Sequence, residues 1–129
     1  MEDGTIPDNL RRYLLTAALS VPHVEAILQL RANAPQPFES ATLSARLYIR
    51  ASVADALLSD LCALGAARIV ADNPLSYAYA PATPELALIL DELEDAYTHN
   101  LIAVTRLIHS LEEHKAHDFA DAFRFRKEP

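Results

Sequence analysis

Glycine and cysteine are scarce in this chain of 129 residues, and each shortage excludes a class of protein. Two glycines are too few for a glycine-rich phosphate-binding loop, and the abundance of alanine and leucine favours helices. The single cysteine, Cys62, cannot form an intrachain disulfide and falls inside a predicted helix, where we expect a buried structural thiol. No stretch approaches the roughly 20 apolar residues that cross a bilayer, and the N-terminus has no basic leader. We therefore expect a mainly α, cytoplasmic protein without a membrane contact.

Basic side chains are also few. The formal net charge of −7 argues against indiscriminate attraction to polyphosphate or RNA. The surplus acid lies mostly in residues 84–129, which hold ten acidic and five basic side chains. Residues 38–83 are close to neutral, with four acidic side chains, three arginines and no lysine. Any contact with nucleic acid must therefore depend on a small number of arginines.

Residue clusters typical of enzymes and metal sites are missing. We find no paired carboxylates and no nucleophile–histidine–acid set in a recognisable context, so we expect no catalytic activity and no cofactor. Four side chains near the C-terminus have spacings that would place two nitrogens and two oxygens on one helical face: His114, His117, Asp118 and Asp121. Their segment is otherwise charged and has no cysteine, so we predict no metal there.

The stretch from Phe38 to Ala80 has the most informative pattern in the chain. In its first part, Leu43 and Leu47 lie four residues apart, which puts them on one face of a short helix. In Arg50–Leu64, apolar residues keep the same spacing, and Gly65 follows as a helix terminator. The pattern predicts two consecutive helices joined by a tight turn.

A β-hairpin follows the second helix. The two short runs Arg68–Ala71 and Ser76–Ala80 flank Asp72-Asn73-Pro74, which is a strong turn signal. Helix, tight turn, helix and hairpin in this order resemble the winged helix-turn-helix regulators of bacteria, over about a third of the chain. The resemblance implies a DNA-binding transcriptional regulator whose second helix enters the major groove.

Flanking helices complete the predicted organisation. We expect an N-terminal helix within residues 1–20, a winged helix-turn-helix over residues 21–83, and a long C-terminal helix with a Phe/Arg tail over residues 84–129. Ser20 opens the first helix of the winged unit, with Pro22 in its first turn. The apolar pattern predicts the core of that unit: Val24, Ile27, Leu28, Leu43, Leu47, Ile49, Val53, Leu57, Leu61, Leu64 and Ile69.

The helix that begins near Arg50 would be the recognition helix. Its early exposed positions would be Arg50, Ser52, Ala54, Asp55 and Ser59, of which Arg50 could contact guanine and the serines phosphate or base. Asp55 and Asp60 would oppose phosphate. The predicted DNA-binding residues of the whole unit are Arg46, Arg50, Ser52, Ser59, Arg68 and Asn73.

A second interpretation stays open because this unit departs from the basic pattern of such regulators. It has no basic wing tip, and the fold could serve as an adaptor that binds a protein partner without binding DNA. The charge of the face from Arg50 to Ser59 discriminates between the two hypotheses.

The segment from Glu85 to Leu111 contains no proline or glycine and predicts one helix of roughly 40 Å. Its apolar residues step alternately by four and three, which is the heptad pattern of a coiled-coil seam. The predicted seam is Leu86, Leu90, Leu93, Tyr97, Asn100, Val104, Leu107 and Leu111. It predicts a homodimer, and the alternative is an amphipathic helix that packs on its own domain.

The tail carries three of the four phenylalanines. Phe119 and Phe123 would share one side of a helix, followed by the basic residues Arg124 and Arg126. We expect these residues either to complete the core or to dock on a partner.

Overall fold

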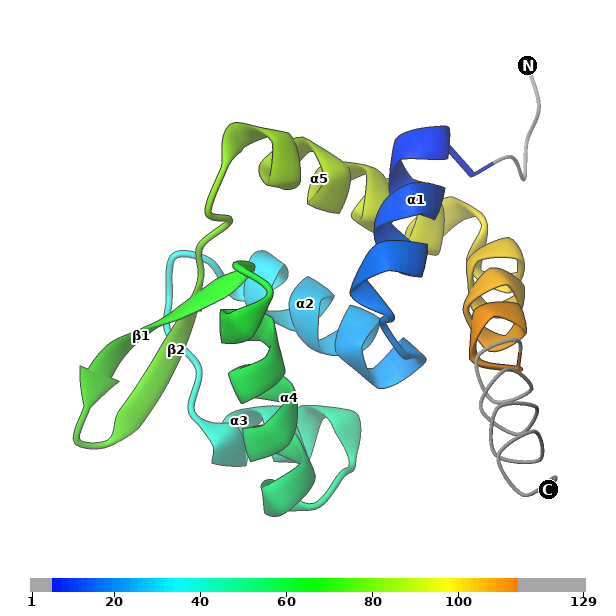
Figure 1. Cartoon of the computed structure of the whole chain (residues 1–129). Helices are drawn as coiled ribbons and strands as arrows, with labels where there is room; N and C mark the ends of the chain where they lie inside the picture. The colour runs from blue at the N-terminus through cyan, green and yellow to red at the C-terminus, as the bar shows by residue number, and fades with distance from the viewer. Residues whose placement is uncertain (1–5, 114–129) are drawn as a thin grey trace, which may run out of the picture.

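The computed structural model describes residues 6–113 and is shown in Figure 1. The elements, in chain order, are α1 (Asp8–Ala17), α2 (Val21–Asn33), α3 (Ser40–Leu47), α4 (Ala51–Ala63), β1 (Ala67–Asp72), β2 (Leu75–Tyr79) and α5 (Pro84–His99). A further helix covers residues 101–113.

Helices α2, α3 and α4 and the β1–β2 hairpin form a winged helix-turn-helix, so the predicted fold is confirmed. In Figure 1 the hairpin projects from one side of the molecule, while α1 lies across α5 on the opposite side. The two flanking helices therefore leave α3, α4 and the hairpin uncovered among the described residues.

Helices α1 and α2 begin and end for local reasons. α1 follows Pro7 and ends at Ala18, whose left-handed backbone (φ 56°) turns the chain. The side chain of Ser20 caps α2, as its sequence predicts. No single helix in residues 6–113 is long and apolar enough to cross a membrane; α1 and α2 pass that test only when taken together, and they are bent by 115°.

The turn between α3 and α4 places a tyrosine in the left-handed backbone region, which non-glycine residues rarely adopt. Tyr48 ends α3 with a left-handed backbone (φ 57°), and its side chain is 93% exposed. The hydroxyl of Ser44 donates to the carbonyl of Ile49 at 2.5 Å and closes the turn. Tyr48 therefore adopts a strained backbone without burying its ring.

The end of α4 and the hairpin agree with the predicted boundaries. Gly65 has φ 81°, and a Cβ there would lie 3.2 Å from the Cβ of Ala82, so only glycine fits easily. β1 and β2 pair antiparallel, with a register shift between Ile69 and Ala71. Phe38 pairs with Tyr77 on the other side of β2.

One apolar core joins the winged unit to the flanking helices. Most of the predicted core residues are buried or half-buried, but Val53 and Ile69 are exposed, so the prediction is wrong for these two. On α4 the buried stripe includes Ala54, which was expected on the surface, and on β1 the projecting hairpin leaves Ile69 uncovered. The largest fully buried side chains are Phe38, Leu10, Leu14, Ile27, Leu30, Leu43, Leu58, Leu61, Leu90, Leu93, Ile108 and Val24.

The prediction of one continuous helix from Glu85 to Leu111 is wrong, because Asn100 interrupts it. Asn100 has a non-helical backbone (φ −137°, ψ 50°), and its N–H donates to Ala96 while its carbonyl accepts from Val104. Asparagine is a favoured N-cap residue, so the polar member of the heptad seam is the place where a new helix starts. Val104 and Ile108 of that helix are fully buried in the chain's own core.

The strained backbone of Tyr48 gives a test of the turn. Tyr48→Gly should raise the free energy of unfolding by about 1 kcal/mol, because it removes the left-handed strain at a site where the ring buries nothing. The melting temperature should rise by a few degrees. Tyr48→Ala is the matched control, since it removes the ring but keeps the Cβ, and it should melt close to the native protein. Equal melting temperatures for both variants would contradict the strained turn.

Candidate nucleic-acid interface

The helix-turn-helix presents one face of α4 to solvent. Leu57, Leu58 and Leu61 bury the inner face, and Ser52, Ala56 and Ser59 lie at helical spacing on the outer face, where all three are exposed. These small side chains leave room for close approach of another molecule. Two of the predicted DNA-binding residues, Ser52 and Ser59, therefore share one exposed face.

Arg50 stands at the start of this face. It is the N-cap residue of α4 and is exposed, and within residues 6–113 its guanidinium has no ion-pair partner. A charged guanidinium at the N-terminal end of a recognition helix can reach base edges or phosphates.

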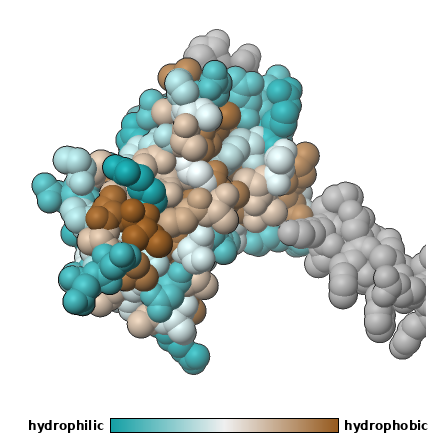
Figure 2. All heavy atoms as spheres, turned by 60° about the vertical axis from the view of Figure 1, so that its left-hand side comes forward, coloured by the Kyte–Doolittle hydropathy of each residue, from teal (hydrophilic) through white to brown (hydrophobic). Residues whose placement is uncertain are grey.

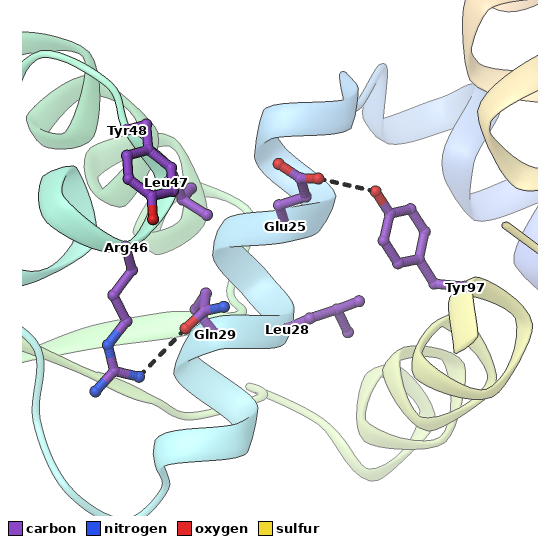
Figure 3. Close-up of a pocket in the computed structure, with 7 residues that line it drawn as sticks. All are labelled: Glu25, Leu28, Gln29, Arg46, Leu47, Tyr48 and Tyr97. Atoms are coloured by element: carbon purple, nitrogen blue, oxygen red, sulfur yellow. Dashed lines mark hydrogen bonds between the residues drawn. The ribbon is translucent and has the colours of Figure 1, made fainter.

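Arg46 lies in the last turn of α3 and not on the outer face of α4. Its Nη1 donates to Gln29 Oε1 at 3.3 Å, and its guanidinium carbon lies 5.0 Å from the centre of the Phe38 ring, a cation–π distance. Figure 3 shows its side chain running from α3 toward α2. The structure thus separates Arg46 from Arg50, although both belong to the predicted set.

Both carboxylates of α4 have partners within the fold. Asp55 accepts a hydrogen bond from the hydroxyl of Ser40 on α3. Asp60 lies 2.9 Å from Nε2 of His23 on α2. These contacts direct each carboxylate toward a neighbouring helix, so their opposition to phosphate is smaller than the sequence suggested.

His23 is a structural residue that sequence reasoning missed. The Ser20 N–H donates to its Nδ1 at 3.2 Å and the His23 N–H donates to Ser20 Oγ at 3.4 Å, which together make a capping box. With Nδ1 accepting, Nε2–H remains to donate to Asp60. The spacing of a capping box, Ser20 followed three residues later by a side-chain acceptor, was the signal in the sequence.

Serine, histidine and aspartate also occur together in hydrolytic triads. Here Ser20 Oγ lies 2.7 Å from His23 Nδ1, but the same oxygen already caps the backbone of α2. We therefore assign the Ser20–His23–Asp60 set to holding α2 against α4.

The wing carries the remaining predicted residues, Arg68 on β1 and Asn73 at the hairpin tip, and both are exposed. Their neighbours are apolar or acidic rather than basic: Ile69, Val70 and Leu75 are exposed, as is Asp72. The wing therefore offers one cation per chain to a nucleic acid.

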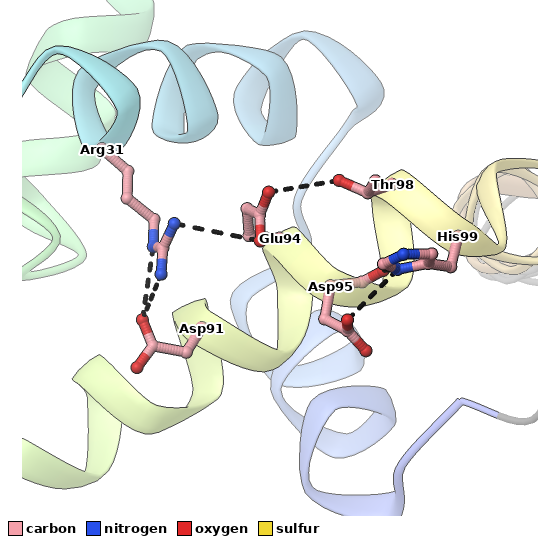
Figure 4. Close-up of polar contacts among 6 residues, drawn as sticks. All are labelled: Arg31, Asp91, Glu94, Asp95, Thr98 and His99. Carbon is pink, nitrogen blue, oxygen red and sulfur yellow. Dashed lines mark hydrogen bonds and ion pairs between the residues drawn. The ribbon is translucent and has the colours of Figure 1, made fainter.

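Polar contacts also join α2 to α5. Arg31 Nη2 lies 2.8 Å from Asp91 Oδ1, and Arg31 Nη1 lies 3.9 Å from Glu94 Oε1. Figure 4 shows the Arg31 side chain reaching from α2 to both carboxylates on α5. The hydroxyl of Tyr97 donates to Glu25 at 3.1 Å. Burial and the nearby Glu25 carboxylate raise the pKa of Tyr97 to about 12, because both disfavour a phenolate.

A cavity of about 460 Å³ opens beside the contact between Tyr97 and Glu25. It lies between α2, the end of α3 and the C-terminal end of α5, as Figure 3 shows. Its lining residues are Glu25, Leu28, Gln29, Arg46, Leu47, Tyr48 and Tyr97. The turn of the helix-turn-helix and α5 therefore border the same hollow.

Two tyrosine hydroxyls are buried between the elements. The hydroxyls of Tyr13 on α1 and Tyr79 on β2 are buried and have no hydrogen-bond partner among the described residues. Burial raises the pKa of both tyrosines, so both stay neutral and able to donate.

The residues of the predicted dimer seam are divided by the break at Asn100. Leu90, Leu93 and Val104 are fully buried within one chain. Leu86, Tyr97, Asn100, Leu107 and Leu111 are half-buried. The tail residues Phe119, Phe123, Arg124 and Arg126, and the histidines and aspartates considered for a metal, lie outside the described residues.

Comparison with known proteins supports the fold. No protein-family model and no curated protein matches the chain. Among solved structures, it is similar to a transcriptional regulator of the MarR family from Silicibacter pomeroyi, at 23% sequence identity and a TM-score of 0.50. The match covers 92% of this chain and 77% of the other. A likeness at this identity shows the fold, which is a winged helix with helices on both sides.

Proposed function

We propose that this protein is a DNA-binding transcriptional regulator that acts as a homodimer. The observation that carries the proposal is the exposed outer face of α4, which contains the small residues Ser52 and Ser59 and begins with Arg50, a residue without an ion-pair partner in residues 6–113. Recognition helices of this fold class place such a face in the major groove. The solved structure to which the chain is similar is described as a transcriptional regulator, which agrees with this function.

The charge distribution defines what kind of binding to expect. Arg50 is exposed at the start of this face and Arg68 is exposed on the wing, while Arg46 is engaged with Gln29 and Phe38. Because these few cations can neutralise only a few phosphates, the dependence of DNA affinity on salt should be shallow and non-specific binding to DNA should be poor. A dimer doubles these contacts and is therefore part of the proposal.

Exposed apolar residues on the flanking helices support the homodimer. Leu15 of α1, Leu88 of α5, and Leu101 and Ile102 of the following helix are all exposed. Rows of large apolar side chains on a surface favour association. We place the contact between chains on these residues together with the half-buried members of the predicted seam, rather than on Leu90, Leu93 and Val104.

The second candidate is an adaptor that uses the winged helix to bind a protein. The acidic net charge and the apolar wing favour it. Selection from a random DNA pool separates the two, because an adaptor would enrich no sequence.

Arg50→Ala tests the role of α4. We expect the variant to bind the selected DNA more weakly by roughly 1–3 kcal/mol, the value of one good base contact. Fluorescence anisotropy at fixed salt measures the change. Arg106→Ala removes an exposed arginine far along the chain and is the control. If Arg50→Ala binds as tightly as this control, α4 does not enter the groove.

Asp55→Asn tests the electrostatics of the same face. The amide oxygen can still accept from Ser40, so the fold should persist while one negative charge near phosphate disappears. We expect DNA affinity to rise by a few-fold, and the gain to shrink as salt is added. Unchanged affinity at low salt would place Asp55 away from the DNA backbone.

Ile102→Glu tests the homodimer. Ile102 is 66% exposed, so the substitution should leave the fold intact but place a charge in the contact between chains. Light scattering should show the native protein as a dimer of the 14.2 kDa chain and the variant as a monomer. Ser110→Glu adds the same charge at an exposed polar site and should stay dimeric. A native protein that is monomeric at all concentrations would refute this part of the proposal.

A further inference from the structure

Tyr48, in the turn between α3 and α4, is far more exposed than an aromatic residue usually is. Its exposed fraction of 93% is the highest among the large apolar and aromatic side chains of residues 6–113. In Figure 3 its hydroxyl makes no hydrogen bond with the other residues drawn. The ring and the hydroxyl of Tyr48 are therefore both presented to solvent.

The end of α3 explains the backbone conformation of Tyr48 but not its side chain. A left-handed residue often ends a helix, and glycine or asparagine is the usual choice. Helix α1 ends in the same way at Ala18, whose side chain is a single methyl group. At Tyr48 a bulky residue adopts φ 57°, which costs free energy, and its ring buries almost none of its surface in return. An unfavourable residue that the fold does not need points to a functional role.

The turn places Tyr48 beside the start of the proposed recognition helix. Arg50, two residues later, is the exposed N-cap residue of α4, and Ile49 between them packs against the core. In helix-turn-helix proteins the first residues of the recognition helix contact base edges, while the preceding helix crosses the sugar–phosphate backbone. The turn that joins these two helices therefore lies at the edge of the groove, where phosphates line the DNA.

Other groups that could hold a phosphate are few on this surface. Residues 38–83 contain three arginines and no lysine. Figure 2, which turns the hairpin side of the molecule forward, shows a compact apolar patch bordered by hydrophilic residues, and Ile69, Val70 and Leu75 of the hairpin are exposed. A tyrosine hydroxyl can donate to a phosphate oxygen without a positive charge. Such a donor suits a DNA-binding surface that is poor in cations.

We propose that Tyr48 contacts DNA, and that its hydroxyl donates a hydrogen bond to a phosphate oxygen at the edge of the groove that α4 enters. The contact fixes the register of α4 on the duplex and reads no base. This role of Tyr48 rests on the proposed DNA-binding function and adds to it a residue that carries no charge.

Tyr48→Phe removes the hydroxyl and keeps the ring. On DNA selected with the native protein, fluorescence anisotropy should show affinity weakened roughly three- to tenfold, the effect of one hydrogen bond. The same factor should apply to a site with one changed base pair, because a phosphate contact carries no sequence information. The salt dependence should match that of the native protein, since the hydroxyl displaces no counterion. Tyr13→Phe, which removes a hydroxyl on α1, is the matched control and should bind like the native protein.

A scan of the DNA backbone locates the partner of the hydroxyl. Each duplex carries one methylphosphonate, which replaces a charged phosphate oxygen by a methyl group. At the contacted phosphate the native protein should lose affinity and Tyr48→Phe should lose little more. At other phosphates the losses from the two changes should multiply, as they do for independent sites.

Tyr48→Gly separates a functional role from a structural one. Relief of the left-handed backbone should raise the melting temperature, while loss of the side chain should weaken DNA binding at least as much as Tyr48→Phe does. A residue that only shaped the turn would not lose DNA affinity in a variant that gains stability. Circular dichroism confirms that each variant is folded.

Three results would overturn the contact. If Tyr48→Phe binds as tightly as Tyr13→Phe while Arg50→Ala binds more weakly, Tyr48 lies off the DNA although the proposed function stands. If the loss in Tyr48→Phe disappears at the changed site, the hydroxyl meets a base and not a phosphate. If the native protein enriches no DNA sequence, the proposed function and the contact fall together.

Discussion

The packing of α2 between the other helices is the constraint on which the rest of the structure depends. Its inner face buries Val24, Ile27 and Leu30, while its polar side chains reach outward to two different neighbours. At its start it contacts α4 through His23, and near its end it contacts α5 through Arg31. A buried aliphatic side chain contributes about 1.5–3 kcal/mol, so the apolar face supplies the stability. The polar contacts, which are partly exposed, contribute less energy and fix the rotation of α2 about its axis.

Scarcity of positive charge governs what the exposed face of α4 can do. With Arg46 engaged at Gln29, two of the three arginines in residues 38–83 remain: Arg50 at the start of α4 and Arg68 on the wing. Two carboxylates on α4 would cancel them, but Ser40 and His23 draw those groups toward the fold. The surface therefore depends on local arrangement rather than on net charge. Such a surface favours sequence-specific contact over general attraction to a polyanion.

The sequence predicts the order and type of the elements because each begins or ends at a strong local signal. Ser20 starts α2, Gly65 ends α4, and the turn before Leu75 separates the strands. The errors arise where one residue has two roles. Asn100 fits a coiled-coil seam and also caps a helix, and heptad spacing cannot distinguish these roles until tertiary packing does. Arg46 could not be separated from Arg50 by sequence, because its side chain is held by Gln29, which lies on another helix, and by the ring of Phe38.

Burial in the C-terminal half limits how a homodimer can be built. Since Leu90 and Leu93 already fill the core of one chain, a second chain can meet the exposed residues but cannot replace the internal ones. In the proposed homodimer, the distance between the two α4 helices then depends on how α5 sits against α2. Arg31 and Tyr97 lie at that junction, so in the proposed homodimer they would bear on the half-site spacing without touching the DNA. In the proposed regulator, the joint between α2 and α5 would therefore be as important for sequence recognition as the exposed face of α4.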